Sequence, residues 1–171
     1  MIEGVGARGV LKNLKNSTIQ FAYNDIKSLK NILESSKDIS AIIMEVKRNL
    51  EPKDNFLKKV RELADKYNIT LIFDECSSGF RSTLGGLHLK YNVYPDICLF
   101  GKALGNGYPI NAVIGKRDLM KQAKETFISS TFWSERLGPS AALKTIEIME
   151  RDKTFKKIKL MSDKVKDIWK K

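Results

Sequence analysis

The sequence predicts an α/β domain with a mainly parallel sheet that helices cover on both faces. Several short runs are apolar without alternation, which is typical of strands buried on both faces. These runs alternate with segments whose apolar residues recur at helical spacing, as in strand–helix–strand units. With 171 residues, 42% of them hydrophobic, the chain is long enough for one domain with a sizeable core. The same composition excludes intrinsic disorder.

The first half of the chain predicts strands and helices in alternation. Segment 18–23 alternates in polarity and is expected to form a short strand. Asn24 or Asp25 then caps a helix, because short side-chain oxygens accept hydrogen bonds from first-turn amides. The next helix begins near Pro52, and it is flanked by the apolar runs expected to form strands at 40–45 and 69–73.

The second half continues the pattern. Strands are expected at 97–100 and 111–115, followed by a short helix, 117–125, and a last brief strand, 127–130. Pro139 lies near the start of another helix, where its missing amide is harmless.

The chain closes on a Lys-rich helix. Ile158, Met161, Val165 and Ile168 recur at helical spacing, which predicts one buried stripe and one charged face. We therefore divide the chain into a domain at 1–152 and a C-terminal helix at 153–171.

The charge balance raises the question of a nucleic-acid partner. The 31 Lys and Arg residues outnumber the 20 Asp and Glu residues, which gives a net charge of +11. A nucleic-acid-binding module is one interpretation. The positive residues are mostly Lys, dispersed and interleaved with acidic residues, and this favours a solvated surface without nucleic acid.

Other sequence features bear on location. No run approaches about 18 apolar residues, so we expect no membrane span, and the N-terminus lacks the pattern of a secretory signal. Cys76 and Cys98 have no metal-type spacing and are expected to be reduced thiols in the cytoplasm.

Charged residues follow three of the predicted strands, and ligands of α/β sheets bind at the carboxyl ends of strands. Glu45 follows the first strand, Asp74 and Glu75 the second, and Lys102 the third. A lysine beside apolar surface loses stabilisation of its charge and can act as an amine nucleophile. A carboxylate and such a lysine suit a Schiff-base site for a pyridine aldehyde cofactor. The plainer alternatives are a carboxylate that caps a turn and a solvated loop lysine.

Two other kinds of site are weighed at the same positions. The glycines at 101, 105 and 107 could let the backbone approach a phosphate, but their spacing matches neither a P-loop nor a Rossmann fingerprint. His88 has no metal ligands nearby in the sequence, so no metal site is predicted. Cys76 is interpreted as a small packing residue rather than a reactive thiol.

These motifs resemble the class-III pyridoxal-phosphate aminotransferases, and among them the glutamate-1-semialdehyde 2,1-aminomutase-like branch. The resemblance rests on two segments in register, Leu71–Arg81 with its Asp-Glu pair and Gly101–Ile110 with its Gly-Lys-x-x-Gly-x-Gly-x-Pro pattern. It extends over about residues 18 to 150. It implies part of the large domain of fold type I, in which residues 153–171 lead towards a small domain that has no counterpart here.

The resemblance also implies roles for individual residues. Lys102 would form the Schiff base with pyridoxal 5'-phosphate and then transfer a proton, and Asp74 would pair with the ring nitrogen. Cys76 would pack on the ring face, and Ser77 would lie at the cofactor's edge. Thr131 would reach the phosphate of a neighbouring subunit's cofactor, which implies a homodimer.

The function expected from the resemblance is amino transfer from a small-molecule amino donor to an aldehyde or ketone acceptor. Two alternatives stay open. One is the intramolecular 2,1-aminomutase reaction of glutamate-1-semialdehyde, and the other is a truncated, non-catalytic fragment. The family's phosphate-binding segment also has no counterpart in the chain, so weak cofactor binding by this piece alone is expected.

Overall fold

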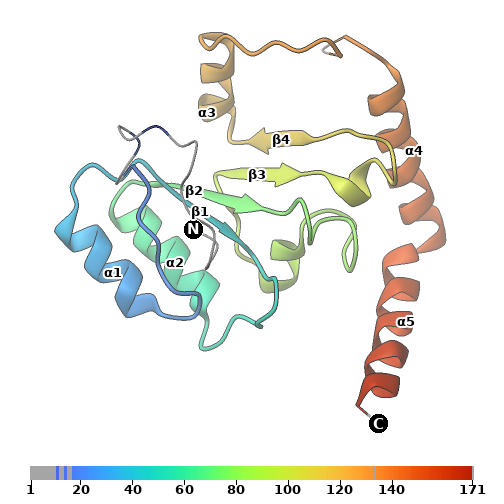
Figure 1. Cartoon of the computed structure of the whole chain (residues 1–171), viewed down its shortest axis with the longest axis horizontal. Coiled ribbons are helices and arrows are strands. Elements are labelled where there is room, and N and C mark those ends of the chain that lie inside the picture. The colour runs from blue at the N-terminus through green and yellow to red at the C-terminus, as the bar shows by residue number, and fades with distance from the viewer. Residues whose placement is uncertain (1–10, 12–13, 15–16, 133, 171) are drawn as a thin grey trace.

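A computed structural model describes residues 11, 14, 17–132 and 134–170, and a four-stranded sheet forms its centre (Figure 1). The strands lie in the order β1-β2-β3-β4, with β1, β2 and β3 parallel and β4 antiparallel to β3. The predicted mainly parallel α/β sheet is confirmed. The strand bounds are Ala41–Glu45 for β1, Thr70–Asp74 for β2, Ile97–Phe100 for β3 and Ala112–Gly115 for β4.

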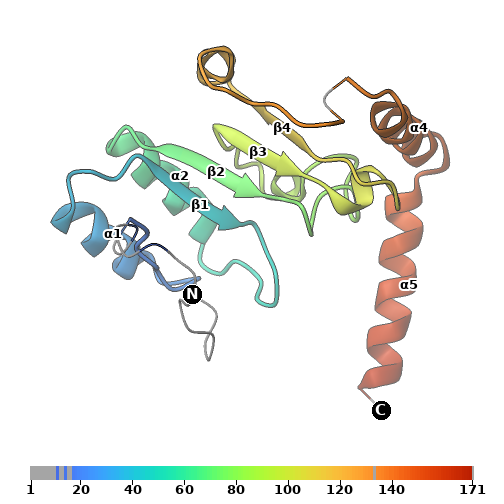
Figure 2. The same cartoon turned by 45° about the horizontal axis from the view of Figure 1, so that its top comes forward.

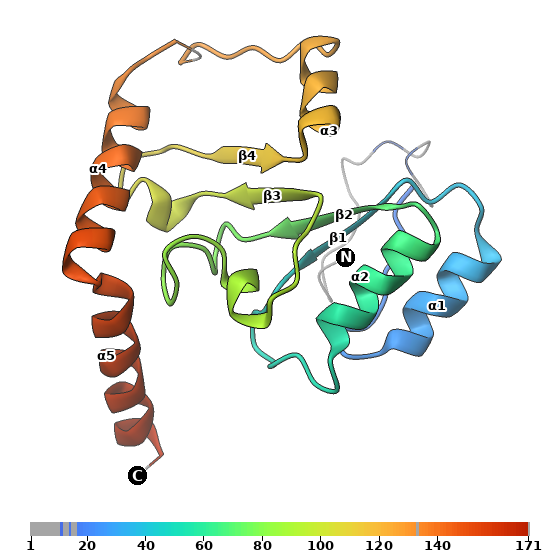
Figure 3. The same ribbon diagram turned by 180° about the vertical axis from the view of Figure 1, so that it is seen from behind.

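Two helices pack side by side on one face of the sheet (Figure 3). Helix α1 spans Ile26–Ser35, and the side chain of Asp25 caps it by accepting a hydrogen bond from the Ser28 amide at 3.0 Å. Helix α2 spans Phe56–Lys66 and begins after Asn55, which is later than the predicted start near Pro52. The buried side chains of both helices join those of the strands in one core, which includes Leu29, Leu33, Phe56, Val60, Leu71 and Phe73.

The opposite face of the sheet is less covered than the sequence suggests. Along β1, Ile42 and Met44 are buried, whereas the Ile43 side chain between them is 55% exposed. The expectation that this strand is buried on both faces is wrong for the described residues. The reason is that α1 and α2 lie on the same side of the sheet (Figure 2).

Two short strands expected from the sequence do not form. Segments 18–23 and 127–130 are both irregular in the structure. A strand needs a neighbour for its backbone hydrogen bonds, and the described sheet contains only β1 to β4. Segment 18–23 instead contributes Phe21 and Tyr23 to the edge of the core, and Phe127 is almost fully exposed.

The C-terminal part of the chain is mostly helical. After β4 come the short helix α3 (Arg117–Lys121) and a single turn, η4 (Gln122–Lys124). Helix α4 (Leu137–Asp152) packs beside the Lys102 turn, and α5 (Thr154–Trp169) follows after a left-handed residue, Lys153.

Helix α5 projects away from the sheet (Figures 1 and 3). Its apolar stripe was expected to be buried, but Met161 and Ile168 are 58% and 67% exposed, so that expectation is wrong for the described residues. Periodicity indicated the stripe correctly, but burial requires an element packed on it. Among the described residues, no helix is long and apolar enough to cross a membrane.

Candidate active site at the ends of β2 and β3

The structure brings Asp74 and Lys102 to the same edge of the sheet. Asp74 is the last residue of β2, and it lies beside Leu99 of the parallel strand β3. Lys102 follows β3 and begins the short turn η3 (Lys102–Leu104). Because β2 and β3 are parallel neighbours, their carboxyl ends meet, as the sequence predicted.

The backbone of Lys102 is held in an unusual conformation. Its φ angle of +45° lies in the left-handed region, which costs a residue with a Cβ about 1 kcal/mol or more. The lysine is fixed by the turn that follows it, because its carbonyl accepts hydrogen bonds from the amides of Gly105 and Asn106. Strain of this kind gathers at functional sites. The lysine side chain itself is exposed, so the described residues do not enclose it in apolar surface as the sequence argument supposed.

Ser77 lies within hydrogen-bonding distance of the lysine amine. The Lys102 Nζ donates to the Ser77 Oγ at 2.6 Å. Ser77 belongs to the tight turn after β2, in which the Asp74 Oδ1 accepts a hydrogen bond from the Cys76 amide at 3.0 Å. Four of the five predicted site residues, Lys102, Asp74, Cys76 and Ser77, therefore lie at the end of β2 or on the turns that follow β2 and β3.

Cys76 is half-buried between these groups and remains a thiol. Burial raises its pKa above the usual value, and the hydrogen bond and charge of Asp74 raise it further, against a smaller opposing effect of the Lys102 charge. A neutral thiol is a weak nucleophile and a good packing surface. A packing role for this side chain stays a prediction.

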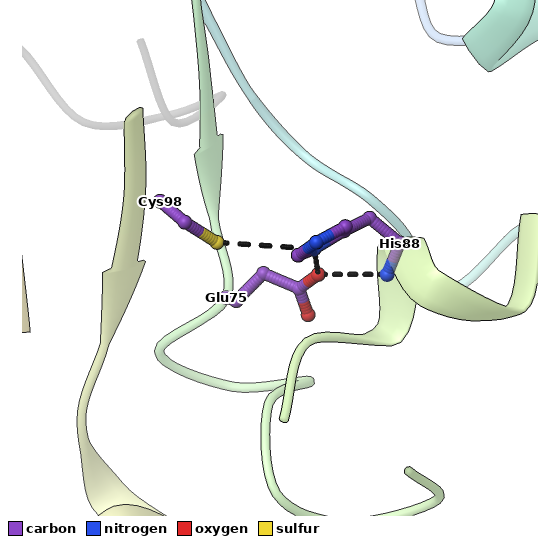
Figure 4. Close-up of side chains that lie close together, drawn as sticks. All are labelled: Glu75, His88 and Cys98. Carbon is purple, nitrogen blue, oxygen red and sulfur yellow. Dashed lines mark hydrogen bonds and ion pairs between the residues drawn. The ribbon is translucent and has the colours of Figure 1, made fainter. Parts of the chain in front are cut away.

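A buried cluster under the turn was not predicted (Figure 4). Glu75 is fully buried, whereas Asp74 just before it is only half-buried. Its Oε1 accepts hydrogen bonds from the His88 amide and the His88 Nδ1, at 2.9 and 2.8 Å. Its Oε2 accepts from the Leu87 amide at 2.8 Å and from the Ser78 Oγ at 2.5 Å.

These four hydrogen bonds favour the charged form of Glu75. Burial alone would raise its pKa, but the hydrogen bonds from His88, Ser78 and the backbone amides outweigh burial and hold the pKa below its usual value. The buried carboxylate ties the turn after β2 to the turn η2 (Leu87–Tyr91). The adjacent Asp-Glu pair was visible in the sequence, but the partner His88 is 13 residues away.

The same cluster bears on metal binding. No metal ligand lies near His88 in the sequence, yet the His88 Nδ1 lies 3.9 Å from the Cys98 Sγ. Glu75, His88 and Cys98 together offer a group of side chains that could hold an ion. Both oxygens of Glu75 already accept hydrogen bonds from protein groups. This arrangement favours a structural role for the cluster.

Two other candidate residues lie outside these two turns. Thr131 is exposed on the segment that leads to α4, and no described hydrogen bond connects it with Lys102 or Asp74. Glu45, which lies beside Asp74 in the sheet, forms an ion pair with Arg48 at 3.5 Å.

An open cavity lies elsewhere, between segment 17–21, α1 and β1. Phe21, Leu33 and Ile43 are among its lining residues, and Lys102 and Asp74 are not. The chemistry of its side chains, rather than a cavity, therefore identifies the candidate site.

Comparison with known proteins agrees with the geometry. The chain is 46% identical over 156 residues to a 3-aminobutyryl-CoA aminotransferase of Cloacimonas acidaminovorans, covering 85% of this chain and 37% of that protein. It is 39% identical over 151 residues to a glutamate-1-semialdehyde 2,1-aminomutase of Sulfolobus acidocaldarius, covering 84% of this chain and 36% of that protein. The chain thus spans little more than a third of the length of these relatives.

Solved structures share the fold. The FumI protein of Sphingopyxis sp. MTA144, in its PLP internal aldimine form, superposes with a TM-score of 0.77 at 26% identity, over 83% of this chain and 36% of that one. The ornithine δ-aminotransferase of Plasmodium falciparum gives a TM-score of 0.74 at 28% identity, over 80% and 37% of the two chains. The family model of class-III aminotransferases matches residues 7–170, and the chain belongs to this family.

Proposed function

We propose that this chain carries the lysine-bearing part of a pyridoxal-phosphate-dependent transaminase. The observation that carries the proposal is the juxtaposition of Lys102 and Asp74 at the ends of two parallel strands, with the lysine backbone held in the left-handed region. Membership of the class-III family supports it.

The residues present fit the cofactor. The amine of Lys102 is exposed and would hold the aldehyde carbon covalently, and the carboxylate of Asp74 would accept a hydrogen bond from the protonated ring nitrogen. The neutral thiol of Cys76 offers packing surface between them. Pyridoxal phosphate, when bound, supplies an electron sink that stabilises negative charge on the substrate carbon next to the amino group.

Within this site Lys102 can transfer a proton, and Asp74 provides a fixed charge. Lys102, once released from covalent attachment, can accept a proton at Nζ and deliver it to a neighbouring carbon, because its flexible side chain is anchored by a fixed backbone turn. Asp74 stays in place, because its Oδ1 accepts a hydrogen bond from the Cys76 amide. Its charge favours the protonated form of the ring nitrogen.

The proposed substrates are a small amino donor and a carbonyl acceptor. Intermolecular transfer is favoured over the aminomutase reaction, because the relative that is 46% identical is named an aminotransferase whereas the aminomutase of Sulfolobus acidocaldarius is 39% identical. Assays with 3-aminobutyryl-CoA and with glutamate-1-semialdehyde separate the two reactions.

We also propose a homodimer and a cytoplasmic location. The homodimer is supported by the exposed position of Thr131, which would be free to contact a second subunit. The location is supported by Cys76 and Cys98, which are free cysteines, as in a reducing compartment. Sedimentation of the chain at several concentrations tests the dimer.

The central test is a map of covalent labelling. The chain is incubated with pyridoxal phosphate at millimolar concentration, reduced with borohydride and digested for mass spectrometry. We expect the pyridoxyl label to concentrate on Lys102, and Lys102→Arg to remove it while the labelling of surface lysines stays the same. Preferential labelling of any other lysine would contradict the assignment.

A further inference from the structure

The contact between Ser77 and Lys102 points to a role beyond a place at the cofactor's edge. The Ser77 Oγ and the Lys102 Nζ are 2.6 Å apart, which is a short hydrogen bond between groups 25 residues apart in the sequence. The amine is the donor in this bond. The neutral form of a lysine amine can donate through N–H and still keep its lone pair, so a bond of this direction can hold the reacting form in place without blocking its nucleophilic electrons.

The serine is held in place by its turn. The Ser77 carbonyl accepts a hydrogen bond from the Arg81 Nε at 2.6 Å, and the Gly79 amide donates to the Glu75 carbonyl at 2.8 Å. A side chain at Gly79 would collide with the Phe100 ring, so the turn packs closely on β3. The buried carboxylate of Glu75 fixes the next residue, Ser78. The hydroxyl of Ser77 is therefore presented by a rigid support.

The Lys102 side chain, unlike the Ser77 hydroxyl, is not held by a rigid support. Its backbone is fixed by the η3 turn, but its side chain is exposed and has four rotatable bonds. Ordering such a side chain costs rotamer entropy. A fixed hydrogen-bond acceptor beside the end of this side chain reduces the number of orientations that the Lys102 amine explores before it reacts.

We propose that Ser77 is a positioning residue, whose hydroxyl holds the Lys102 amine in the orientation in which it reacts with a pyridoxal aldehyde. The inference rests on the proposed function, since it names the group that acts on the same lysine. The hydroxyl makes its contribution before any substrate binds, so its effect is measurable in the rate at which Lys102 is modified.

The experiment compares two variants of the same shape. Ser77→Thr keeps the hydroxyl, and Ser77→Val replaces it with a methyl group. The full chain is exposed to pyridoxal phosphate, quenched with borohydride at short times, and the initial labelling rate of Lys102 is divided by that of Lys58, an exposed lysine on α2. Ser82→Ala, which removes a hydroxyl from the same loop, is the matched control.

We expect Ser77→Val to lower the Lys102-to-Lys58 labelling ratio roughly ten-fold, as for the loss of one hydrogen bond at the upper end of the usual range. Ser77→Thr should restore the ratio to within about two-fold, and Ser82→Ala should leave it unchanged. Thermal unfolding followed by circular dichroism checks that the variants fold. If Ser77→Val is unstable, Ser77→Ala takes its place against the wild type, with the same ten-fold expectation.

Equal labelling ratios for Ser77→Val and Ser77→Thr, with the wild type still labelled preferentially at Lys102, would overturn the role of Ser77 and leave the proposed function standing. Absence of preferential Lys102 labelling in the wild type would overturn both.

Discussion

The replacement Glu75→Gln tests how much the buried carboxylate under the active-site turn contributes to stability. Glutamine has the shape of glutamate but only one acceptor oxygen. If that oxygen takes the place of Oε1, it keeps both bonds from His88, and its amino group then faces the Leu87 amide, which donates to Oε2 in the wild type. Ser78 can rotate its hydroxyl to accept, but a backbone amide cannot change from donor to acceptor.

The variant therefore leaves one buried N–H without a partner, which costs about 1–3 kcal/mol. The remaining bonds also lose their charge-assisted strength, roughly a factor of two. We expect a loss of about 3 kcal/mol in the free energy of unfolding at pH 7, measured by urea denaturation with far-UV circular dichroism. Glu62→Gln, on an exposed face of α2, is the control and should change the free energy of unfolding by less than about 0.5 kcal/mol. A loss below about 1 kcal/mol for Glu75→Gln, with an unchanged denaturant dependence, would refute the reasoning.

Three further outcomes follow from the same structure. The pKa of Glu75 is lower in the folded state than in the unfolded state, where it is about 4.3. The stabilising contribution of Glu75 is therefore complete above the unfolded pKa and is lost as the pH falls through the folded pKa. The unfolding free energies of wild type and Glu75→Gln should converge in urea titrations below about pH 4. Gly79→Ala should destabilise by about 1–3 kcal/mol in the same assay, because its Cβ would lie 2.7 Å from the Phe100 Cδ1. Asp96→Asn should lower the free energy of unfolding by about 2–4 kcal/mol, because the buried carboxylate accepts hydrogen bonds from the Arg61 guanidinium at 2.8 Å and from a β2 amide. A thermal midpoint equal to that of the wild type would contradict this.

The sequence was a good guide where local pattern and burial coincide. The apolar runs located β1 to β3 to within a residue, and the Asp25 cap placed the start of α1. It failed at segment 18–23, whose alternation resembles a strand, and at segment 127–130, because no strand of the described sheet pairs with either of them. Strand formation depends on a partner that local sequence does not specify.

Some features of the candidate site could likewise be predicted from the sequence, and others could not. Lys102 and Asp74 could be chosen from the sequence, because each follows an apolar run and parallel strands bring their carboxyl ends together. The contact of Ser77 with Lys102 and that of Glu75 with His88 could not be chosen, since they depend on how two turns fold back over the strand ends.

Periodicity and residue chemistry are local properties, so the sequence was enough to predict the strands that form the sheet, the helices between them and the chemical types at the strand ends. The tertiary structure alone decided which side chains meet, which face of the sheet is covered, and that α5 leaves its apolar stripe exposed. Those outcomes depend on packing between segments distant in the chain, and only the folded arrangement sets that packing.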